Sequence, residues 1–243
     1  MNHQSRITSH QSPIADHQSL RALLSAAITQ LEREHVPSPA LAAELLLMHT
    51  LGRDRPWIYA HPEHELEATA REKYFALIAQ RASGVPTQHL TGHQEFWGLD
   101  FEVTPDVLIP RPETEHVIEV ALERLGIADV TDIAGREKKL RVADVGTGSG
   151  CIAIALAHEL PQAHITATDV SAAALEIAAR NAARHEVADR IEFIECDLLG
   201  LSSHQSPATS HQSPSSHQSP TFDLIASNPP YIGRREAATL PPT

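Results

Sequence analysis

The sequence predicts an α/β protein with a parallel sheet, preceded by a small helical bundle and a β-hairpin linker. Three observations support this fold class. Apolar residues recur at helical spacing through residues 20–84, and two short strand patterns surround a glycine within residues 95–103. From Leu140 onward, apolar strands alternate with helices, which is typical of parallel βαβ units whose sheet is covered on both faces.

Composition and charge exclude several classes of protein. The chain has 243 residues, of which 42% are hydrophobic, and its formal net charge is −12. Direct nucleic-acid binding is not expected, because dedicated nucleic-acid binders carry a basic face. No stretch approaches the ~20 apolar residues of a membrane span, and the two cysteines, Cys151 and Cys196, lack the spacing of a metal site. We therefore expect a soluble, cytoplasmic protein.

Polar repeats mark two segments that we expect to be disordered. The triplet His-Gln-Ser begins at positions 3, 10 and 17, and it returns at positions 204, 211 and 217. These segments hold too few large apolar residues to offset the entropy lost on ordering. We expect a disordered tail over residues 1–19 and a low-complexity insert over residues 202–220.

Residues 20–84 are expected to form the helical domain. The segment "LRALLSAAITQLEREH" places its apolar residues on one helical face. Ser38 is expected to cap the next helix, "PALAAELLLMHTLG", which has Pro39 at its first position and Gly52 beyond its end. The segment "ELEATAREKYFALIAQRASG" repeats the helical pattern and ends at Gly84.

The sheet follows a hairpin and a proline-rich linker, residues 85–112, and a helix in "TEHVIEVALERLG". Strands are expected in "LRVADVG", "HITATD", "RIEFIECD" and "FDLIASN", with helices in "CIAIALAHEL" and "SAAALEIAARNAARH" between the first three. Ligands of such sheets bind at the carboxyl ends of the strands, so the residues that follow each strand are the candidate site.

The first of these strands ends in a glycine-rich turn, "DVGTGSG", residues 144–150. Its glycines allow a ligand to approach the backbone closely, and the helix that follows presents free N–H groups there. Cys151 stands where a dinucleotide fingerprint has its third glycine, and the absence of Gly-Lys-Ser/Thr excludes a P-loop. An ordinary strand-to-helix turn is the alternative.

Acidic residues end the next two strands. Asp169 can accept hydrogen bonds from two ribose hydroxyls, and Asp197 is placed to meet an adenine edge. For each aspartate alone, an N-cap of a following helix is the alternative, and Asp169 stands just before "VSAAALE". Together with the glycine turn, the two aspartates favour an adenosine-binding site.

The order of these motifs resembles a known superfamily. "DVGTGSG", Asp169, Asp197 and "NPPY" (228–231) resemble the class I S-adenosylmethionine-dependent methyltransferases, and the tetrapeptide resembles that of enzymes that methylate a planar NH2 group. The helical domain and "GHQEFWGLDFEVTPDVLIPRPETE" are similar to the protein-(glutamine-N5) methyltransferases of peptide chain release factors.

The resemblance implies methyl transfer from S-adenosylmethionine to the side-chain nitrogen of a glutamine in release factors, without a metal ion. It implies that the helical domain docks the release factor and that residues 113–243 bind the cofactor. The implied cofactor contacts are Gly146, Thr147, Gly148, Ser149, Gly150, Asp169, Asp197, Leu198 and Asn228. Relatives often carry an aromatic residue where Leu198 stands, so its contact would be only apolar.

The resemblance also implies that Asn228, Pro229, Pro230 and Tyr231 bind the substrate amide and form the catalytic set. The Asn228 side-chain oxygen and the Pro229 carbonyl can each accept an N–H hydrogen bond, while Tyr231 lies against the flat amide. The prolines fix this geometry in advance, which lowers the cost of reaching the transition state. A proline turn that only closes the strand is the alternative.

Two other functions stay open. The same tetrapeptide suits an adenine-N6 DNA methyltransferase, although an acidic chain with a small helical domain disfavours DNA. The other is a non-catalytic fragment that binds cofactor or a partner, because sheets of this superfamily have seven strands and this chain supplies about four. We therefore expect a C-terminally truncated chain with an incomplete sheet.

Overall fold

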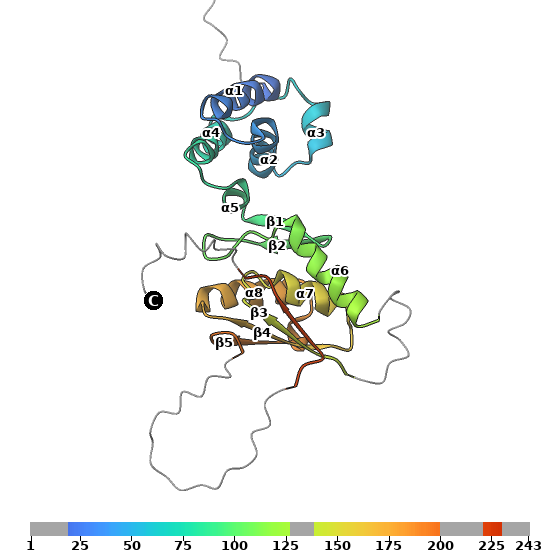
Figure 1. Ribbon diagram of the computed structural model, residues 1–243. Helices are drawn as coiled ribbons and strands as arrows, with labels where there is room; N and C mark the ends of the chain where they lie inside the picture. The colour runs from blue at the N-terminus through green and yellow to red at the C-terminus, as the bar shows by residue number, and fades with distance from the viewer. Residues whose placement is uncertain (1–18, 127–138, 200–220, 230–243) are drawn as a thin grey trace, which may run out of the picture. The chain divides into compact units, whose positions relative to one another are not determined.

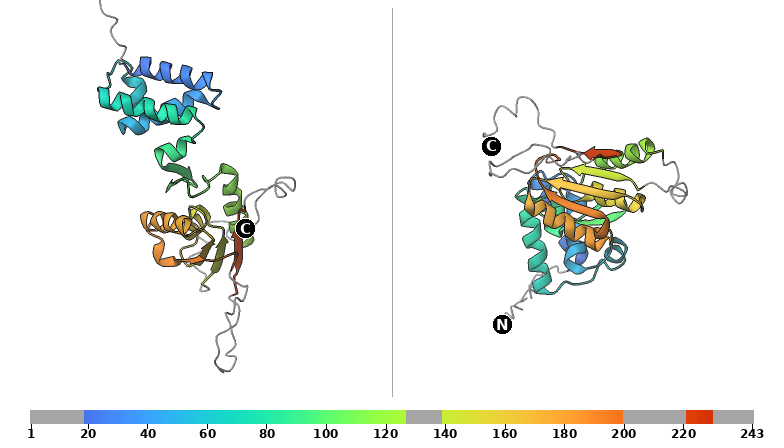
Figure 2. Two further views of the ribbon diagram at one scale, coloured as in Figure 1. Left: turned by 90° about the vertical axis from the view of Figure 1, so that its left-hand side faces the viewer. Right: turned by 90° about the horizontal axis from the view of Figure 1, so that it is seen from below.

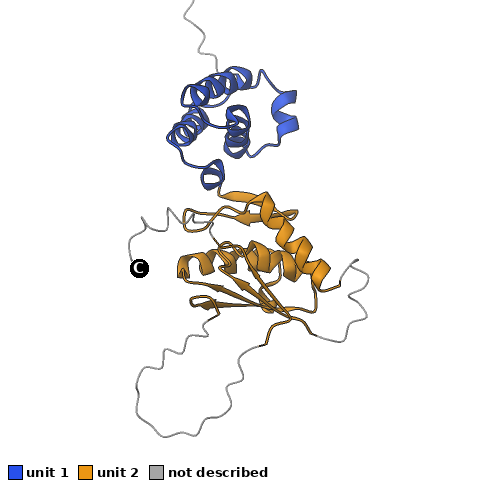
Figure 3. Cartoon of the chain, viewed as in Figure 1, with its two compact units in different colours: residues 1–91 blue, residues 92–243 orange. Residues whose placement is uncertain are grey.

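The computed structural model describes residues 19–126, 139–199 and 221–229. It divides into two compact units, residues 1–91 and 92–243, which Figure 3 draws in blue and orange. The helical unit thus extends beyond the expected boundary at Gly84, and the hairpin belongs to the second unit. Apart from Ser19, the segments expected to be disordered lie outside the described residues.

The first unit is helical. Its elements are α1 (Leu20–Arg33), α2 (Pro39–Leu51), α3 (Arg55–Ala60), α4 (Ala68–Ala82) and α5 (Thr87–Thr91). The Ser19 side chain caps α1 by accepting a hydrogen bond from the Ala22 N–H. Ser38 stands at the expected N-cap position of α2, but its backbone is left-handed and its side chain makes no cap bond.

The core of the first unit lies between α1, α2 and α4. Its largest fully buried side chains are Leu20, Leu31, Leu46, Leu47, Tyr74 and Ile78. The Tyr74 hydroxyl donates a hydrogen bond to the Ala43 carbonyl at 3.1 Å, so its polar atom is satisfied within the core. Within the described ranges, none of the helices has the length and apolar character needed to cross a membrane.

The second unit begins with the expected hairpin, β1 (His93–Phe96) and β2 (Leu99–Glu102), which pair antiparallel. The two turn residues, Trp97 and Gly98, have φ angles of +55° and +70°. Two-residue hairpin turns with positive φ at both positions match the twist of the flanking strands. This conformation explains why a glycine stands in the turn.

The sheet of the second unit is parallel, with strand order β5-β4-β3-β6. Its strands are β3 (Arg141–Val145), β4 (His164–Asp169), β5 (Ile191–Glu195) and β6 (Leu224–Ser227). Val145 is paired with both Thr168 and Ser227, so the carboxyl ends of the strands lie level at one edge. This confirms the four expected strands and brings the residues that follow them together.

The helices α6 (Glu115–Arg124), α7 (Cys151–Glu159) and α8 (Ala172–Arg184) lie together on one face of the sheet (Figures 1 and 2). The crossovers β3–α7–β4 and β4–α8–β5 step in the same direction along the sheet, and right-handed crossovers then place both helices on one face. The sequence suggested helices on both faces, but none of the described helices lies on the other face, where Ile225 of β6 is 57% exposed.

Candidate active site

A pocket opens at the carboxyl edge of the sheet. This strand-end pocket has a volume of about 370 Å³. Most of the residues predicted for the site line it, namely Gly146, Gly148, Asp169, Asp197, Leu198, Asn228 and Pro229. Thr147 and Ser149 line a smaller adjoining pocket together with Arg111, Thr114 and Asn228. Pro230 and Tyr231 lie outside the described residues.

A buried carboxylate holds the glycine turn in place. Asp144 is fully buried, and its Oδ2 accepts hydrogen bonds from the Thr147 hydroxyl at 2.7 Å and the Ala153 N–H at 3.1 Å. Burial raises the pKa of Asp144 to about 6, and the two hydrogen bonds oppose that rise. Asp144 therefore ties the turn to the first turn of α7.

The glycines of the turn have different surroundings. Gly146 and Gly148 line the strand-end pocket with φ angles of +74° and +56°, which favour glycine. Gly150 lines neither pocket, although it was expected to contact the cofactor. A Cβ at Gly150 would lie 3.1 Å from Cβ of Ala178, so this glycine allows α7 to pack closely against α8.

The carboxylate of Asp169 joins the glycine turn to the start of α8. Its Oδ2 accepts the Gly148 N–H at 2.9 Å, and its Oδ1 accepts the Ser171 N–H at 3.0 Å. The N-cap of α8 is Ser171, whose side chain accepts from the Ala174 N–H, so the alternative role of Asp169 as the cap is wrong. Each carboxylate oxygen has more than one acceptor position, so Asp169 can still bind hydroxyl groups.

The segment after β5 is attached to the end of β4. β5 ends at Glu195, so Asp197 lies beyond the strand and not at its last position. The Leu198 carbonyl accepts a hydrogen bond from the Thr168 hydroxyl at 2.6 Å, and the Cys196 N–H donates to the Asp169 carbonyl at 3.0 Å. Leu198 is 68% exposed and lines the strand-end pocket, so it offers an apolar surface to a ligand.

Asn228 and Pro229 follow β6 at the rim of both sheet and pocket. The Asn228 Nδ2 donates a hydrogen bond to the Thr114 hydroxyl at 2.8 Å. The Ser227 hydroxyl donates to the Val145 carbonyl at 2.8 Å, which ties the end of β6 to β3. The substrate-binding segment expected from the sequence is therefore attached to the glycine-turn strand and to the start of α6.

The charge of the strand-end pocket indicates the kind of ligand that it can hold. Among the described residues its charged lining is entirely acidic, consisting of Asp106, Asp169 and Asp197. A phosphate-bearing ligand would be repelled by these carboxylates, whereas a sulfonium cation with a ribose would be attracted. The lining therefore fits S-adenosylmethionine better than a dinucleotide.

Sequence reasoning missed Asn181 on α8. This residue is fully buried; its Nδ2 donates to the carbonyls of Ser149 and Glu102 at 2.9 and 3.0 Å, and its Oδ1 accepts the Glu102 N–H at 2.8 Å. It thus joins the glycine turn to the hairpin. The available signal was an amide among the alanines of the apolar face of α8.

Sequence reasoning also missed the pocket residues Val107 and Leu108. The available signal for them was an apolar pair within a proline-rich segment.

The parallel sheet, the glycine turn and the acidic residues beside it define a class I S-adenosylmethionine-dependent methyltransferase. Comparison with known proteins supports the same class. A family model described as "PrmC N-terminal domain" matches residues 22–92, and one described as "Methyltransferase domain" matches residues 136–238.

Individual relatives narrow the class to one family. The release factor glutamine methyltransferase of Koribacter versatilis is 46% identical over 219 residues, which cover 90% of this chain and 69% of that relative. The enzyme of that name from Chlorobaculum tepidum is 44% identical over 222 residues, which cover 91% of this chain and 70% of the relative. The chain belongs to the release factor glutamine methyltransferase family.

Proposed function

We propose that this chain acts in the cytoplasm and transfers the methyl group of S-adenosylmethionine to the side-chain N5 of a glutamine in peptide chain release factors. The observation that carries the proposal is the strand-end pocket, where the glycine turn and Asp169 meet Asn228 and Pro229. The residues proposed to bind the nucleoside and those proposed to accept the amide N–H groups therefore line one cavity. The family membership of the chain identifies the amide as glutamine.

The cofactor residues are proposed from their placement. Asp169 binds the ribose hydroxyls, and Asp197 and Leu198 lie against the adenine. The backbone of the glycine turn, residues 146–149, lies along the methionine part of the cofactor. When bound, S-adenosylmethionine would supply an electrophilic methyl group on a cationic sulfur, and the acidic lining attracts that cation to the pocket.

Asn228 and Pro229 prepare the glutamine nitrogen for reaction. An amide nitrogen is a poor nucleophile because its lone pair is delocalised into the carbonyl group. The Asn228 side-chain oxygen and the Pro229 carbonyl each accept one N–H, which favours a nitrogen whose lone pair faces the methyl group. The proton leaves after the C–N bond has formed, so no general base is needed beforehand. Pro230 and Tyr231, which the sequence also predicts for this set, lie outside the described residues.

Methylation of a release factor tests this function directly. The chain, a release factor and S-adenosylmethionine are incubated, and the tryptic peptides are analysed by mass spectrometry. We expect one added methyl group on a glutamine side chain, and none on a release factor in which that glutamine is replaced by glutamate. Methylation of adenine in a DNA control, with none on the release factor, would contradict the proposal and favour the DNA methyltransferase.

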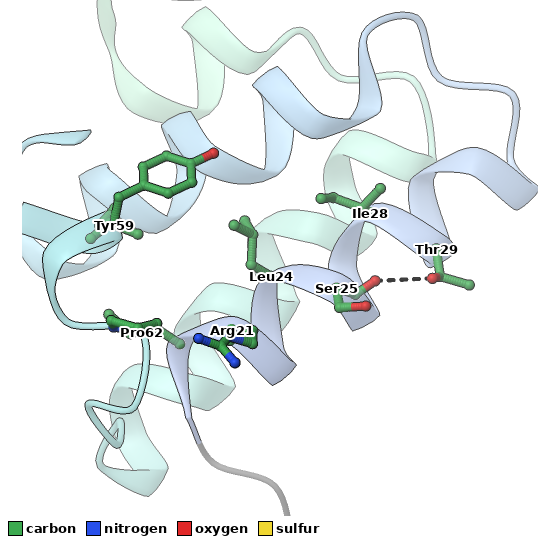
Figure 4. A pocket seen from close by; sticks show the side chains of 9 residues that line it. Arg21, Leu24, Ser25, Ile28, Thr29, Tyr59 and Pro62 are labelled. Carbon is green, nitrogen blue, oxygen red and sulfur yellow. Dashed lines mark hydrogen bonds between the residues drawn. The ribbon is translucent and has the colours of Figure 1, made fainter. Parts of the chain in front are cut away.

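The helical unit is proposed to dock the release factor. It carries a second pocket of about 400 Å³, the α1–α3 pocket, lined by Leu20, Arg21, Leu24, Ser25, Ile28, Thr29, Ile58, Tyr59 and Pro62 (Figure 4). Tyr59 is 60% exposed, yet its hydroxyl donates a hydrogen bond to the buried carboxylate of Glu44, which Arg55 also contacts. An exposed aromatic side chain held in one position is typical of a protein-binding anchor.

Replacement of Tyr59 tests the docking role. We expect Tyr59→Ser to raise the KM for the folded release factor severalfold while the KM for S-adenosylmethionine stays unchanged. The matched control is Leu41→Ser, which removes a 47% exposed side chain from α2 that does not line the α1–α3 pocket. Equal effects of the two substitutions would argue against docking at this pocket.

A further inference from the structure

The hydroxyl of Thr114 makes an unusual contact for its position. Thr114 is the residue before α6, where threonine side chains commonly accept a hydrogen bond from the first turn of the helix. Here the side chain makes no cap bond, and the backbone is already helical with φ −69° and ψ −21°. The hydroxyl oxygen instead accepts a hydrogen bond from Nδ2 of Asn228 at 2.8 Å.

The position of this hydroxyl is fixed by its surroundings. Thr114 is only 5% exposed, so water competes little for the bond to Asn228. It closes a short 3-10 helix, Pro112–Thr114, in which its N–H donates to the Arg111 carbonyl at 2.9 Å. Pro112 restricts the backbone at the start of that helix. The proline-rich segment thus places one oxygen atom against the amide group of Asn228.

The contact determines which atom of Asn228 faces away from α6. The last torsion of an asparagine side chain is broad and roughly two-fold, so its oxygen and NH2 group exchange places at little intrinsic cost. With Oδ1 toward the substrate, Asn228 offers an acceptor to the substrate NH2 group. In the other orientation the NH2 group of Asn228 faces the substrate NH2 group, and two donors meet. A bond from Nδ2 to Thr114 holds the NH2 group on the α6 side and therefore directs Oδ1 to the opposite side.

We propose that Thr114 is a positioning residue for methyl transfer, because its hydroxyl orients Oδ1 of Asn228 as the acceptor for the substrate amide. The inference rests on the proposed role of Asn228 in amide binding. In this role Thr114 acts through its contact with Asn228 and not on the reacting nitrogen or the methyl group. Its effect should therefore appear in the chemical step and not in cofactor affinity.

Substitutions at Thr114 separate the hydroxyl from the shape of the side chain. Thr114→Val keeps the shape and removes the hydroxyl, and we expect kcat to fall roughly tenfold, the effect of one lost hydrogen bond. Cofactor affinity, measured by calorimetry, should change less than about twofold. Thr114→Ser keeps the hydroxyl and should restore kcat to near the value of the unmodified enzyme. A Val variant as fast as the unmodified enzyme would overturn the proposal.

A double-mutant cycle with Asn228→Asp tests orientation specifically. A carboxylate has two equivalent acceptor oxygens, so the identity of the atom that faces the substrate no longer depends on Thr114. In the Asn228→Asp background we expect Thr114→Val to lower kcat by less than about twofold. An equal loss in both backgrounds would show that Thr114 acts by another route. If the Val variant does not fold, Thr114→Ala and Thr114→Ser make the same comparison.

A measurement that needs no turnover distinguishes this inference from the proposed function. The side-chain NH2 protons of Asn228 should exchange slowly with solvent in NMR spectra of the unmodified enzyme and faster in Thr114→Val. Slow exchange would show that the contact between Asn228 and Thr114 is present. If no release factor were methylated as well, the proposed function would be contradicted while the contact stood. Fast exchange in the unmodified enzyme would contradict the role of Thr114.

Discussion

At the scale of single residues, the carboxylate of Asp169 has two roles that one substitution would remove together. It accepts N–H groups from Gly148 and Ser171, and it is the proposed acceptor for the ribose hydroxyls. A control is therefore needed that weakens the start of α8 and keeps the carboxylate of Asp169. Ser171 supplies it, because its hydroxyl caps α8.

We expect Asp169→Ala to weaken cofactor binding by about 1–3 kcal/mol, because ribose hydroxyls lose their acceptor. Ser171→Ala should lower the melting temperature, with a stability loss of about 1 kcal/mol from the lost cap, and, because Ser171 also lines the strand-end pocket, it should weaken cofactor binding less than Asp169→Ala does. Calorimetry and thermal melts on both variants measure these effects. Unchanged affinity in Asp169→Ala would show that its carboxylate only supports the turn.

The buried carboxylate of Asp144 predicts a pH dependence of stability. Burial raises its pKa from 3.8 to about 6, so between these values the folded state binds more protons than the unfolded state. The free energy of unfolding therefore falls as the pH rises through this range. Above pH 6 the ionised Asp144 lowers it by about 3 kcal/mol.

Replacement of Asp144 by Asn should remove this dependence. Urea unfolding of Asp144→Asn and of the unmodified chain between pH 4 and pH 7 measures this dependence. As the pH rises, the Asn variant should become more stable relative to the unmodified chain. A difference that does not vary with pH would contradict the raised pKa.

At the scale of elements, two of the contacts that join α8 to the hairpin lie at Glu102 and are of different kinds. Asn181 exchanges buried hydrogen bonds with the backbone of Glu102, and Arg180 forms an exposed ion pair with the Glu102 carboxylate at 2.8 Å. Buried backbone groups without partners cost more than an exposed ion pair contributes.

We expect Asn181→Ala to lower the free energy of unfolding by about 3 kcal/mol or more, because three backbone groups lose their partners. Arg180→Ala should cost less than about 1 kcal/mol. Chemical denaturation of the two variants gives the comparison. Similar losses for both would mean that the buried amide does not hold the hairpin to α8.

Most elements could be predicted from local patterns, and the exceptions have physical reasons. The strands and the long helices show clear apolar periodicity, and the hairpin has its glycine at a positive φ. The sequence pattern did not predict α3 and α5, because helices of 6 and 5 residues are too short to show a helical period. Ser38 has the residue type of a cap but a left-handed backbone, which its sequence does not reveal.

At the scale of the whole molecule, the sequence predicted which residues follow each strand but not how they contact one another. The strand order brings β6 beside β3, which places Asn228 next to the glycine turn. Its contact with Thr114 joins residues 114 positions apart, a separation that no local pattern covers. Motif chemistry could therefore identify the candidate site, whereas the residues that support it required the fold.

Methyl transfer is proposed to depend on the acceptor that Asn228 supplies. Single-turnover transfer of labelled methyl groups to a release factor, compared between the unmodified chain and Asn228→Ala, tests it most directly. We predict a rate loss of roughly 100- to 1000-fold, as for other preorganised hydrogen-bonding groups, with a smaller loss of cofactor affinity. An Asn228→Ala variant that transfers methyl groups at the unmodified rate would contradict this role of Asn228.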